Sequence, residues 1–348
     1  MKKMKPSKMK RVKLIEPKKA IIEEVDYPKP GPRDVIMKVA YCGICGSDLH
    51  ASIGKHPFVP LPATPGHEFS GWIQEVGSDV TEFKIGDRIT AEPNLVCGKC
   101  YNCRTGRYNI CEKLRVMGCQ GDGAMAEYFL LSADKTVPIP NNLSLKNAAL
   151  VEPMAVGVHA VHRAGDLYMK NVVIVGAGMI GLAVLASVVR AGAKRIWVTD
   201  LDDKRLALAK EIGATRIINA REDVVKKIRE EAGYEGIDVA FEAVGIEATL
   251  RTCMDVIRKG GKVVVIGVFG DESRIKSAIL QDWEMELIGT LMYVRRDIEE
   301  AISILADGKF PSDKIIGKIF PLERVNEAFE WAREHKETIK TILEIHKE

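Results

Sequence analysis

Four cysteines lie close together in the chain at the spacing of a zinc site. Their order is Cys97-x2-Cys100-x2-Cys103-x7-Cys111. Four thiolates match the tetrahedral coordination of Zn²⁺, and a site closed by four protein ligands leaves no position for a substrate. An iron–sulfur cluster or a nucleic-acid-binding zinc knuckle would use the same residue type. The spacing favours a structural zinc that holds a lobe of the protein together.

A second set of possible metal ligands is scattered along the chain. It consists of Cys45, His67, Glu68 and Glu152. One thiolate, one imidazole and one carboxylate with a fourth position open would make a catalytic zinc site. Considered one at a time, each residue also has an ordinary structural explanation: a packed cysteine, a core histidine or a surface glutamate. Spacing alone leaves both interpretations open.

Gly176, Gly178 and Gly181 have the G-x-G-x-x-G spacing of a dinucleotide-binding loop. They follow the apolar run 172–175 and precede a predicted helix at 179–191, whose N-terminal N–H groups would face the cofactor phosphates. A second predicted strand ends at Asp200, about 20 residues after Gly181, where a carboxylate reaches the adenosine ribose. An unrelated glycine-rich loop would not be expected to have a strand, a helix, a second strand and a terminal acidic residue around it in this order.

The elements that must position these residues are of two kinds. Short strands without intervening helices predict an antiparallel, β-rich region at 10–15, 20–25, 34–41, 68–76, 88–91 and 126–131. From about residue 151, predicted helices (153–164, 179–191, 204–212, 224–231, 247–258) alternate with predicted strands (172–175, 195–199, 216–219, 238–243, 262–267). This alternation is typical of a doubly wound parallel sheet. Two helices, at 297–306 and 325–335, and a last strand at 338–344 follow.

The composition is that of an ordinary globular protein, with 348 residues, 46% of them hydrophobic and 28% charged. The uncharged run 172–189 is long enough to cross a membrane, but glycines at cofactor spacing favour a buried βα unit. Basic residues crowd the N-terminus: Lys2, Lys3, Lys5, Lys8, Lys10, Arg11 and Lys13. We interpret them as a frayed, solvated end rather than a nucleic-acid-binding tail. No apolar secretory segment follows, and the cysteine spacing indicates metal rather than disulfides, so we expect a cytoplasmic protein.

Five motifs occur in the same order as in the zinc-containing medium-chain alcohol dehydrogenases, which the chain resembles over about residues 9–344. They are Cys45-Gly46-Ser47-Asp48-Leu49-His50, Gly66-His67-Glu68, the cysteine lobe, Glu152-Pro153 and Gly176-Ala177-Gly178-Met179-Ile180-Gly181. The resemblance implies a GroES-like catalytic domain at 1–153 plus 290–348, with the zinc lobe at 93–115. It further implies an inserted Rossmann domain at 154–289, an active site in the cleft between the domains, and a homodimer or homotetramer.

The resemblance also implies a role for each candidate site residue. Cys45 and His67 would bind the catalytic zinc, with Glu68 and Glu152 coordinating or facing it. Ser47 would take the proton of the alcohol and pass it towards His50, while the cofactor accepts a hydride. Asp200 favours NAD over NADP, because a carboxylate repels the additional phosphate. The cofactor site would also include Ile180, Arg205, Ile266, Gly267 and Val268.

Within this family the chain most resembles the sorbitol-like polyol, butanediol-like diol and threonine dehydrogenase branches. We therefore expect oxidation of a secondary alcohol in a polyol or diol, with L-threonine 3-dehydrogenase as the alternative enzyme. Two positions depart from the sorbitol pattern: Met292 stands where an arginine is usual, and Ala51 where an aromatic residue is usual. A non-catalytic zinc protein, structural or nucleic-acid-binding, is the alternative of another class. Retention of Ser47 and His50 argues against it.

Overall fold

The computed structural model describes residues 5–348, which form two compact units. The first unit comprises Met1–Glu152 and Ser312–Glu348, and the second comprises Pro153–Pro311. The sequence analysis assigns residues 290–311 to the catalytic domain, which corresponds to the first unit. In the structure these residues lie in the second unit. Each unit has its own sheet.

A seven-stranded sheet forms the first unit. Its order is β16-β17-β3-β4-β5-β9, and β8 also pairs with β3. All pairs are antiparallel except β16 with β17. The strands are β3 (Asp34–Ile44), β4 (Glu68–Val76), β5 (Arg88–Ala91), β8 (Tyr128–Ser132), β9 (Thr136–Pro138), β16 (Ile316–Pro321) and β17 (Lys340–Glu344). β3 is buried along almost its whole length, so it is the centre of this unit.

A separate hairpin, β1 (Lys8–Glu16) with β2 (Lys19–Asp26), begins the described part of the first unit. The expectation of a frayed basic end is wrong for Lys8, Lys10, Arg11 and Lys13, because all four lie in β1. Acidic partners across the hairpin account for part of this order: Lys8 lies 2.6 Å from Asp26, and Arg11 lies 2.7 Å from Glu23. Lys2 and Lys3 lie outside the described residues.

Short elements complete the first unit. They are α1 (Gly46–Ser52), β6 (Asn94–Leu95), α2 (Tyr101–Arg104), η1 (Tyr108–Ile110), β7 (Arg115–Val116), η2 (Ala133–Lys135), α3 (Leu145–Ala148), α11 (Ser312–Ile315), η4 (Leu322–Arg324) and α12 (Val325–Glu334). Phe69, Ile73 and Ile89 lie in the core of this unit, each at most 1% exposed. The small α2 and the adjoining loops form the cysteine lobe.

A six-stranded, fully parallel sheet forms the second unit, in the order β12-β11-β10-β13-β14-β15. The strands are β10 (Asn171–Val175), β11 (Arg195–Asp200), β12 (Arg216–Asn219), β13 (Ile237–Glu242), β14 (Ile257–Val265) and β15 (Glu286–Gly289). Numbered within the unit, this order is 3-2-1-4-5-6, the order of a dinucleotide-binding Rossmann fold. The predicted fold class is confirmed.

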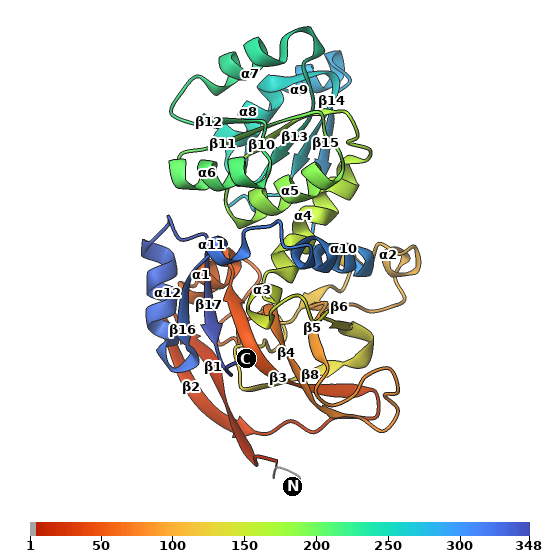
Figure 1. Ribbon diagram of the computed structural model, residues 1–348, viewed down its shortest axis with the longest axis vertical. Helices are drawn as coiled ribbons and strands as arrows, with labels where there is room; N and C mark the ends of the chain where they lie inside the picture. The colour runs from red at the N-terminus through yellow and green to blue at the C-terminus, as the bar shows by residue number, and fades with distance from the viewer. Residues whose placement is uncertain (1–4) are drawn as a thin grey trace. The chain divides into compact units, whose positions relative to one another are not determined.

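Helices cover both faces of the parallel sheet. Figure 1 shows α5 (Met179–Arg190) and α6 (Asp203–Ile212) on one side, with α7 (Val224–Ala232) and α8 (Glu247–Val256) on the other. The remaining helical segments are α4 (Val151–Ala164), η3 (Gly233–Glu235), α9 (Ser277–Asp282) and α10 (Arg295–Ala306). β10 is buried at every position, as a strand covered on both faces requires. Among residues 5–348, no helix is both long and apolar enough to cross a membrane.

A buried carboxylate joins two helices of the second unit. Asp297, in the first turn of α10, is 0% exposed and lies 2.7 Å from Nδ1 of His159 and 2.6 Å from Nδ1 of His162, both on α4. The same carboxylate accepts the N–H of Val294 and so caps its own helix. These contacts hold α10 to α4, which explains why residues 290–311 belong to the second unit.

Candidate active site and structural metal centre

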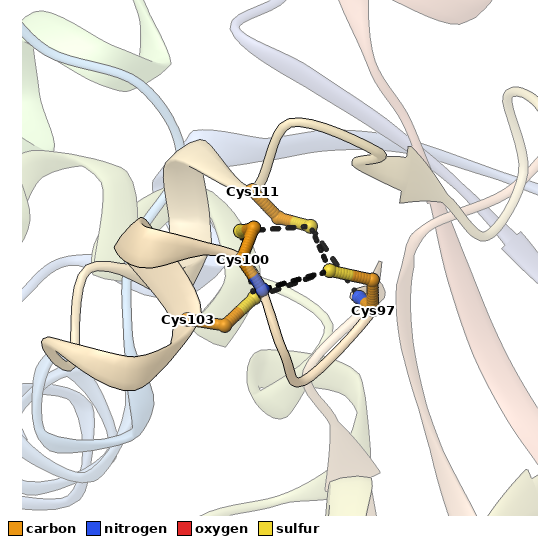
Figure 2. A group of neighbouring side chains, drawn as sticks. All are labelled: Cys97, Cys100, Cys103 and Cys111. Carbon is orange, nitrogen blue, oxygen red and sulfur yellow. Dashed lines mark hydrogen bonds between the residues drawn. The ribbon is translucent and has the colours of Figure 1, made fainter.

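The four cysteines of the lobe turn their sulfur atoms towards one another (Figure 2). All four sulfurs lie within 4.8 Å of one another. Separations of 3.5 Å between Cys97 and Cys111 and of 3.9 Å between Cys97 and Cys103 are close to the edge of a tetrahedral ZnS₄ site, about 3.8 Å. The residues present therefore fit a closed zinc site.

Backbone N–H groups donate to the sulfur atoms of Cys97 and Cys111. The N–H groups of Cys97 and Lys113 both donate to Sγ of Cys111, at 3.3 Å each. Backbone N–H groups of Lys99 and Cys100 lower the pKa of Cys97 to about 6. Burial and the neighbouring thiols of Cys100 and Cys111 instead raise the pKa of Cys103 to about 12, so binding of a metal would displace its proton.

Three of the four scattered ligand candidates meet in the first unit. One ligand atom each of Cys45, His67 and Glu68 lies within 4.8 Å of the other two. Cys45 is the N-cap of α1, His67 directly precedes β4, and Glu68 is the first residue of that strand. A thiol, an imidazole and a carboxylate gathered in this way form a donor set that fits zinc.

Asp48 lies beside the first two of these residues. One of its carboxylate oxygens accepts the N–H of Cys45 at 2.9 Å, and the other lies 3.8 Å from Nδ1 of His67. Burial lowers the pKa of His67, but Asp48 and Cys45 outweigh burial, so this pKa lies well above its ordinary value. At 3.8 Å the interaction between Asp48 and His67 is electrostatic rather than a hydrogen bond, and Nδ1 of His67 has no hydrogen-bond partner among the described residues.

Glu68 is held by a buried lysine. Nζ of Lys340, the first residue of β17, lies 2.6 Å from each carboxylate oxygen of Glu68. Burial alone would lower the pKa of Lys340, but Glu68, Cys45 and Glu152 raise it overall. Opposite Glu68 on β3, a side chain at Gly43 would come within 2.1 Å of the carboxylate, so glycine is required there.

The other predicted catalytic residues lie at the edge of this group. Glu152, in the first turn of α4, is 7% exposed and is not one of the three clustered donors, although its charge acts on Lys340. Ser47 is half-buried and His50 is exposed, both on α1. A hydroxyl nearer the interior and an imidazole nearer solvent are in the order that a proton path to water requires.

The predicted dinucleotide site lies at the carboxyl ends of parallel strands in the second unit. Gly176 has φ +102, and a side chain there would meet Val244 at 2.6 Å. At Gly181 a side chain would come within 1.8 Å of the Gly176 carbonyl oxygen. Gly178 is the N-cap of α5 and has open space beside it. The loop thus leaves room for a pyrophosphate at the start of a helix.

Asp200 ends β11 beside this loop. Its Oδ2 accepts the N–H of Ala177 at 2.7 Å, and Nη1 of Arg205 lies 4.0 Å from the same oxygen. Ile180 lies in the first turn of α5, and Ile266, Gly267 and Val268 follow β14 at the same sheet edge. Val268 is 77% exposed, which suits an apolar wall for a flat ring of a cofactor.

Several residues of the site carry no recognisable sequence signal. Lys340 reaches Glu68 only through the fold. His56 is coupled to His50 and His67, and burial together with these two rings lowers its pKa. In the second unit Glu242, which is 0% exposed, accepts the N–H groups of Val244 and Gly245 at 2.9 Å each and shapes the loop after β13. Glu242 is the last residue of β13, and a charged residue at the end of an otherwise apolar strand is the sequence signal that could have found it.

Together, a Rossmann sheet with a glycine-lined crevice and donor sets for a closed and an open metal site define a zinc-dependent oxidoreductase that uses a nicotinamide dinucleotide. Residues 31–141 match the alcohol dehydrogenase GroES-like domain, and residues 179–307 match the zinc-binding dehydrogenase family. The chain belongs to the zinc-containing medium-chain alcohol dehydrogenases. It is therefore an enzyme acting on alcohols, and the non-catalytic alternative is not supported.

Known relatives cover nearly the whole chain. Sorbitol dehydrogenase of Bacillus subtilis (strain 168) is 35% identical over 97% of this chain and 98% of its own length. An L-threonine 3-dehydrogenase of Marinomonas sp. (strain MWYL1) is 36% identical over 82% of this chain and 83% of its own. The crystal structure of a zinc-binding dehydrogenase from Sinorhizobium meliloti 1021 bound to NADP has a TM-score of 0.91 at 32% identity, covering 98% of this chain and 100% of that one.

Proposed function

We propose that this enzyme transfers a hydride between the secondary alcohol of a polyol or diol and NAD, giving the ketone or ketose. The meeting of Cys45, His67 and Glu68 within 4.8 Å carries the proposal, because it supplies three donors and leaves room for a substrate oxygen. Similarity to a sorbitol dehydrogenase supports the polyol. Assembly as a homodimer or homotetramer, in the cytoplasm, is part of the same proposal.

Each residue of the first unit has a chemical task in this proposal. Bound zinc supplies Lewis acidity towards an alcohol oxygen, and the nicotinamide ring supplies the hydride acceptor. Cys45, His67 and one of Glu68 and Glu152 would hold the metal, while the other carboxylate orients water or the substrate. Ser47 would accept the hydroxyl proton of the alcohol, and His50 would release it to solvent, since His50 is exposed.

NAD is the proposed cofactor because of Asp200. A carboxylate at the end of β11 accepts hydrogen bonds from both hydroxyls of a ribose and repels a 2′-phosphate. Arg205 lies 4.0 Å from this carboxylate, which neutralises part of its charge. The S. meliloti relative was crystallised with NADP, so the preference must be measured rather than assumed from the family.

Rates with a set of substrates test the proposal. We would follow NADH and NADPH formation with sorbitol, xylitol, 2,3-butanediol and L-threonine, on enzyme whose zinc content has been measured. Turnover of polyols or the diol with NAD is the expected result. Preferred turnover of L-threonine would establish the alternative, which the Marinomonas relative supports. Faster turnover with NADP would reverse the cofactor assignment, and no turnover of any alcohol would contradict the proposed function.

A further inference from the structure

The segment 290–294 connects the last strand of the parallel sheet to α10. β15 ends at Gly289, which is paired with Val265 of β14, and the N–H of Thr290 donates to the Val265 carbonyl oxygen at 3.2 Å. Residues 266–268, which are candidates for the cofactor site, follow Val265 directly. The segment therefore leaves the sheet at the same carboxyl edge as the glycine loop after β10.

This part of the edge is expected to receive the nicotinamide half of a dinucleotide. The two halves of the cofactor bind on opposite sides of the position where the strand order reverses, which here lies between β10 and β13. Asp200 at the end of β11 marks the adenosine side, because its carboxylate suits ribose hydroxyls. The nicotinamide side consequently lies at the carboxyl ends of β13, β14 and β15, and the segment 290–294 borders it.

Two features of the segment are unusual for a simple connection. Met292 has φ +48, a left-handed conformation that a residue with a side chain rarely adopts. The hydroxyl oxygen of Thr290 is buried and has no hydrogen-bond partner among the described residues. Strained backbone persists only where the surrounding structure holds it, and strained or unpaired groups occur often at ligand sites. The conformation of this segment therefore needs support from outside it.

Asp297 supplies that support from the first turn of α10. Its Oδ2 accepts the N–H of Val294 at 2.9 Å, so the carboxylate fixes the residue at which the segment ends. The same carboxylate, which is 0% exposed, lies 2.7 Å from Nδ1 of His159 and 2.6 Å from Nδ1 of His162. Both histidines are on α4, which lies beside α10 (Figure 1). One buried group thus ties the segment 290–294 to α4.

This arrangement is specific to an ionised carboxylate. Two oxygens can accept hydrogen bonds from Val294 and from both histidines at once, whereas the amide of an asparagine has a single acceptor oxygen. Glu300 lies 3.2 Å from Nε2 of His162, so each nitrogen of that ring faces a carboxylate. The other charged groups at the cluster are Arg296 on α10, 3.4 Å from Asp297, and Arg190 on α5, 3.9 Å from Glu300.

We propose that Asp297 is a positioning residue for the cofactor: by holding the segment 290–294 to α4, it fixes the part of the crevice that borders the nicotinamide ring. This inference rests on the proposed dinucleotide site and extends it to α4 and α10. No chemical step is assigned to Asp297 or to the two histidines. Loosening the segment should weaken binding of the nicotinamide ring and leave binding of the adenosine half unchanged, because Asp200 and the glycine loop belong to other elements.

Two ligands that differ by the nicotinamide ring test the proposal. We would measure dissociation constants of NADH and of ADP-ribose, which lacks that ring, by titration calorimetry on zinc-loaded enzyme. Asp297→Asn should weaken NADH binding about tenfold, because a preordered part of the site is lost, and should change ADP-ribose binding by less than about twofold. Asp307→Asn replaces an exposed acid at the other end of α10 and should change neither constant.

A milder variant covers the case in which Asp297→Asn does not fold. His162→Gln leaves the cap on Val294 intact and should weaken NADH binding alone, about threefold. Equal weakening of NADH and ADP-ribose would show a general disturbance of the second unit, and unchanged NADH binding in both variants would show that the cluster does not support the segment. Either result would overturn the proposal. Absence of binding of both ligands to the unmodified enzyme would instead defeat the proposed cofactor site, and this inference with it.

Discussion

Nζ of Lys340 lies 2.6 Å from both carboxylate oxygens of Glu68, and the two residues are 272 positions apart in the chain. Both are the first residues of strands that flank β3, and they are 4% and 1% exposed. The C-terminal segment therefore supplies the counter-ion of a carboxylate in the candidate catalytic group. Lys340 also donates to the Ile44 carbonyl at 3.3 Å, one residue before Cys45.

Replacing Lys340 by methionine should destabilise the first unit by about 3–5 kcal/mol, because a buried carboxylate then lacks its partner. The free energy of unfolding from urea titrations, with zinc content measured in parallel, checks this. Lys347→Met changes an exposed lysine of the same C-terminal segment and should have almost no effect. Equal stability of Lys340→Met and the unmodified protein at full zinc content would mean that the ion pair is not important for folding.

In the cysteine lobe, Cys103→Ser should reduce the zinc content from about two ions to about one per chain, because a closed site needs all four thiolates. Elemental analysis after dialysis against a weak chelator measures this. The matched control is Cys253→Ala, whose thiol lies in the core of the second unit. Retention of two zinc ions by Cys103→Ser would contradict the assignment of these cysteines to a structural site.

The second unit was the easier part to predict from the sequence. Strands buried on both faces, such as β10, are continuous apolar runs, and the glycines of the loop after β10 must lack side chains for steric reasons. By contrast β16 has exposed Gly317, Lys318 and Ile319 in its centre and no regular alternation, so it was missed. Its partner β17 was found because four of its five residues are buried.

The candidate ligands were identified by the order of their motifs, but the residues around them were not. A buried lysine such as Lys340 looks the same in a sequence as an exposed one, and only the pairing of β17 with β3 brings it to Glu68. Such a residue is brought to the candidate ligands by a contact between segments far apart in the sequence, and a local sequence pattern does not predict such a contact.

Asp200→Asn should reduce the preference for NAD over NADP about tenfold in kcat/KM, which is about 1.4 kcal/mol. The asparagine keeps one acceptor oxygen for the Ala177 N–H and loses the acceptor of the Asp202 N–H, while the charge that repels a 2′-phosphate is also lost. Asp203→Asn is the control, because Asp203 is an exposed acid in the first turn of α6 and should leave the ratio unchanged. An unchanged ratio in Asp200→Asn would show that this carboxylate does not select the cofactor.

The cluster of Asp297 with His162 should make the stability of the second unit depend on pH. Burial would raise the pKa of Asp297, but hydrogen bonds from His159 and His162 lower this pKa overall. The ionised Asp297 therefore stabilises the folded state above about pH 4, and this stabilisation is lost as acid protonates the carboxylate. The hydrogen bond to Asp297, with Glu300 at 3.2 Å, raises the pKa of His162 despite burial and Arg296. The stabilisation that protonated His162 provides is complete below about pH 6.5, and it is lost as the pH rises through the raised pKa of His162.

Both contributions are therefore present together between about pH 4 and pH 6.5. His162→Gln, which carries no charge at any pH, should cost about 1–2 kcal/mol near pH 5.5 and clearly less near pH 9. Thermal unfolding of the variant and the unmodified protein at a series of pH values measures the difference. Asp297→Asn should destabilise at every pH above 4, by about 3 kcal/mol, because it weakens both contacts to α4 at once. A cost of His162→Gln that grows towards pH 9 would contradict the direction assigned to the His162 pKa.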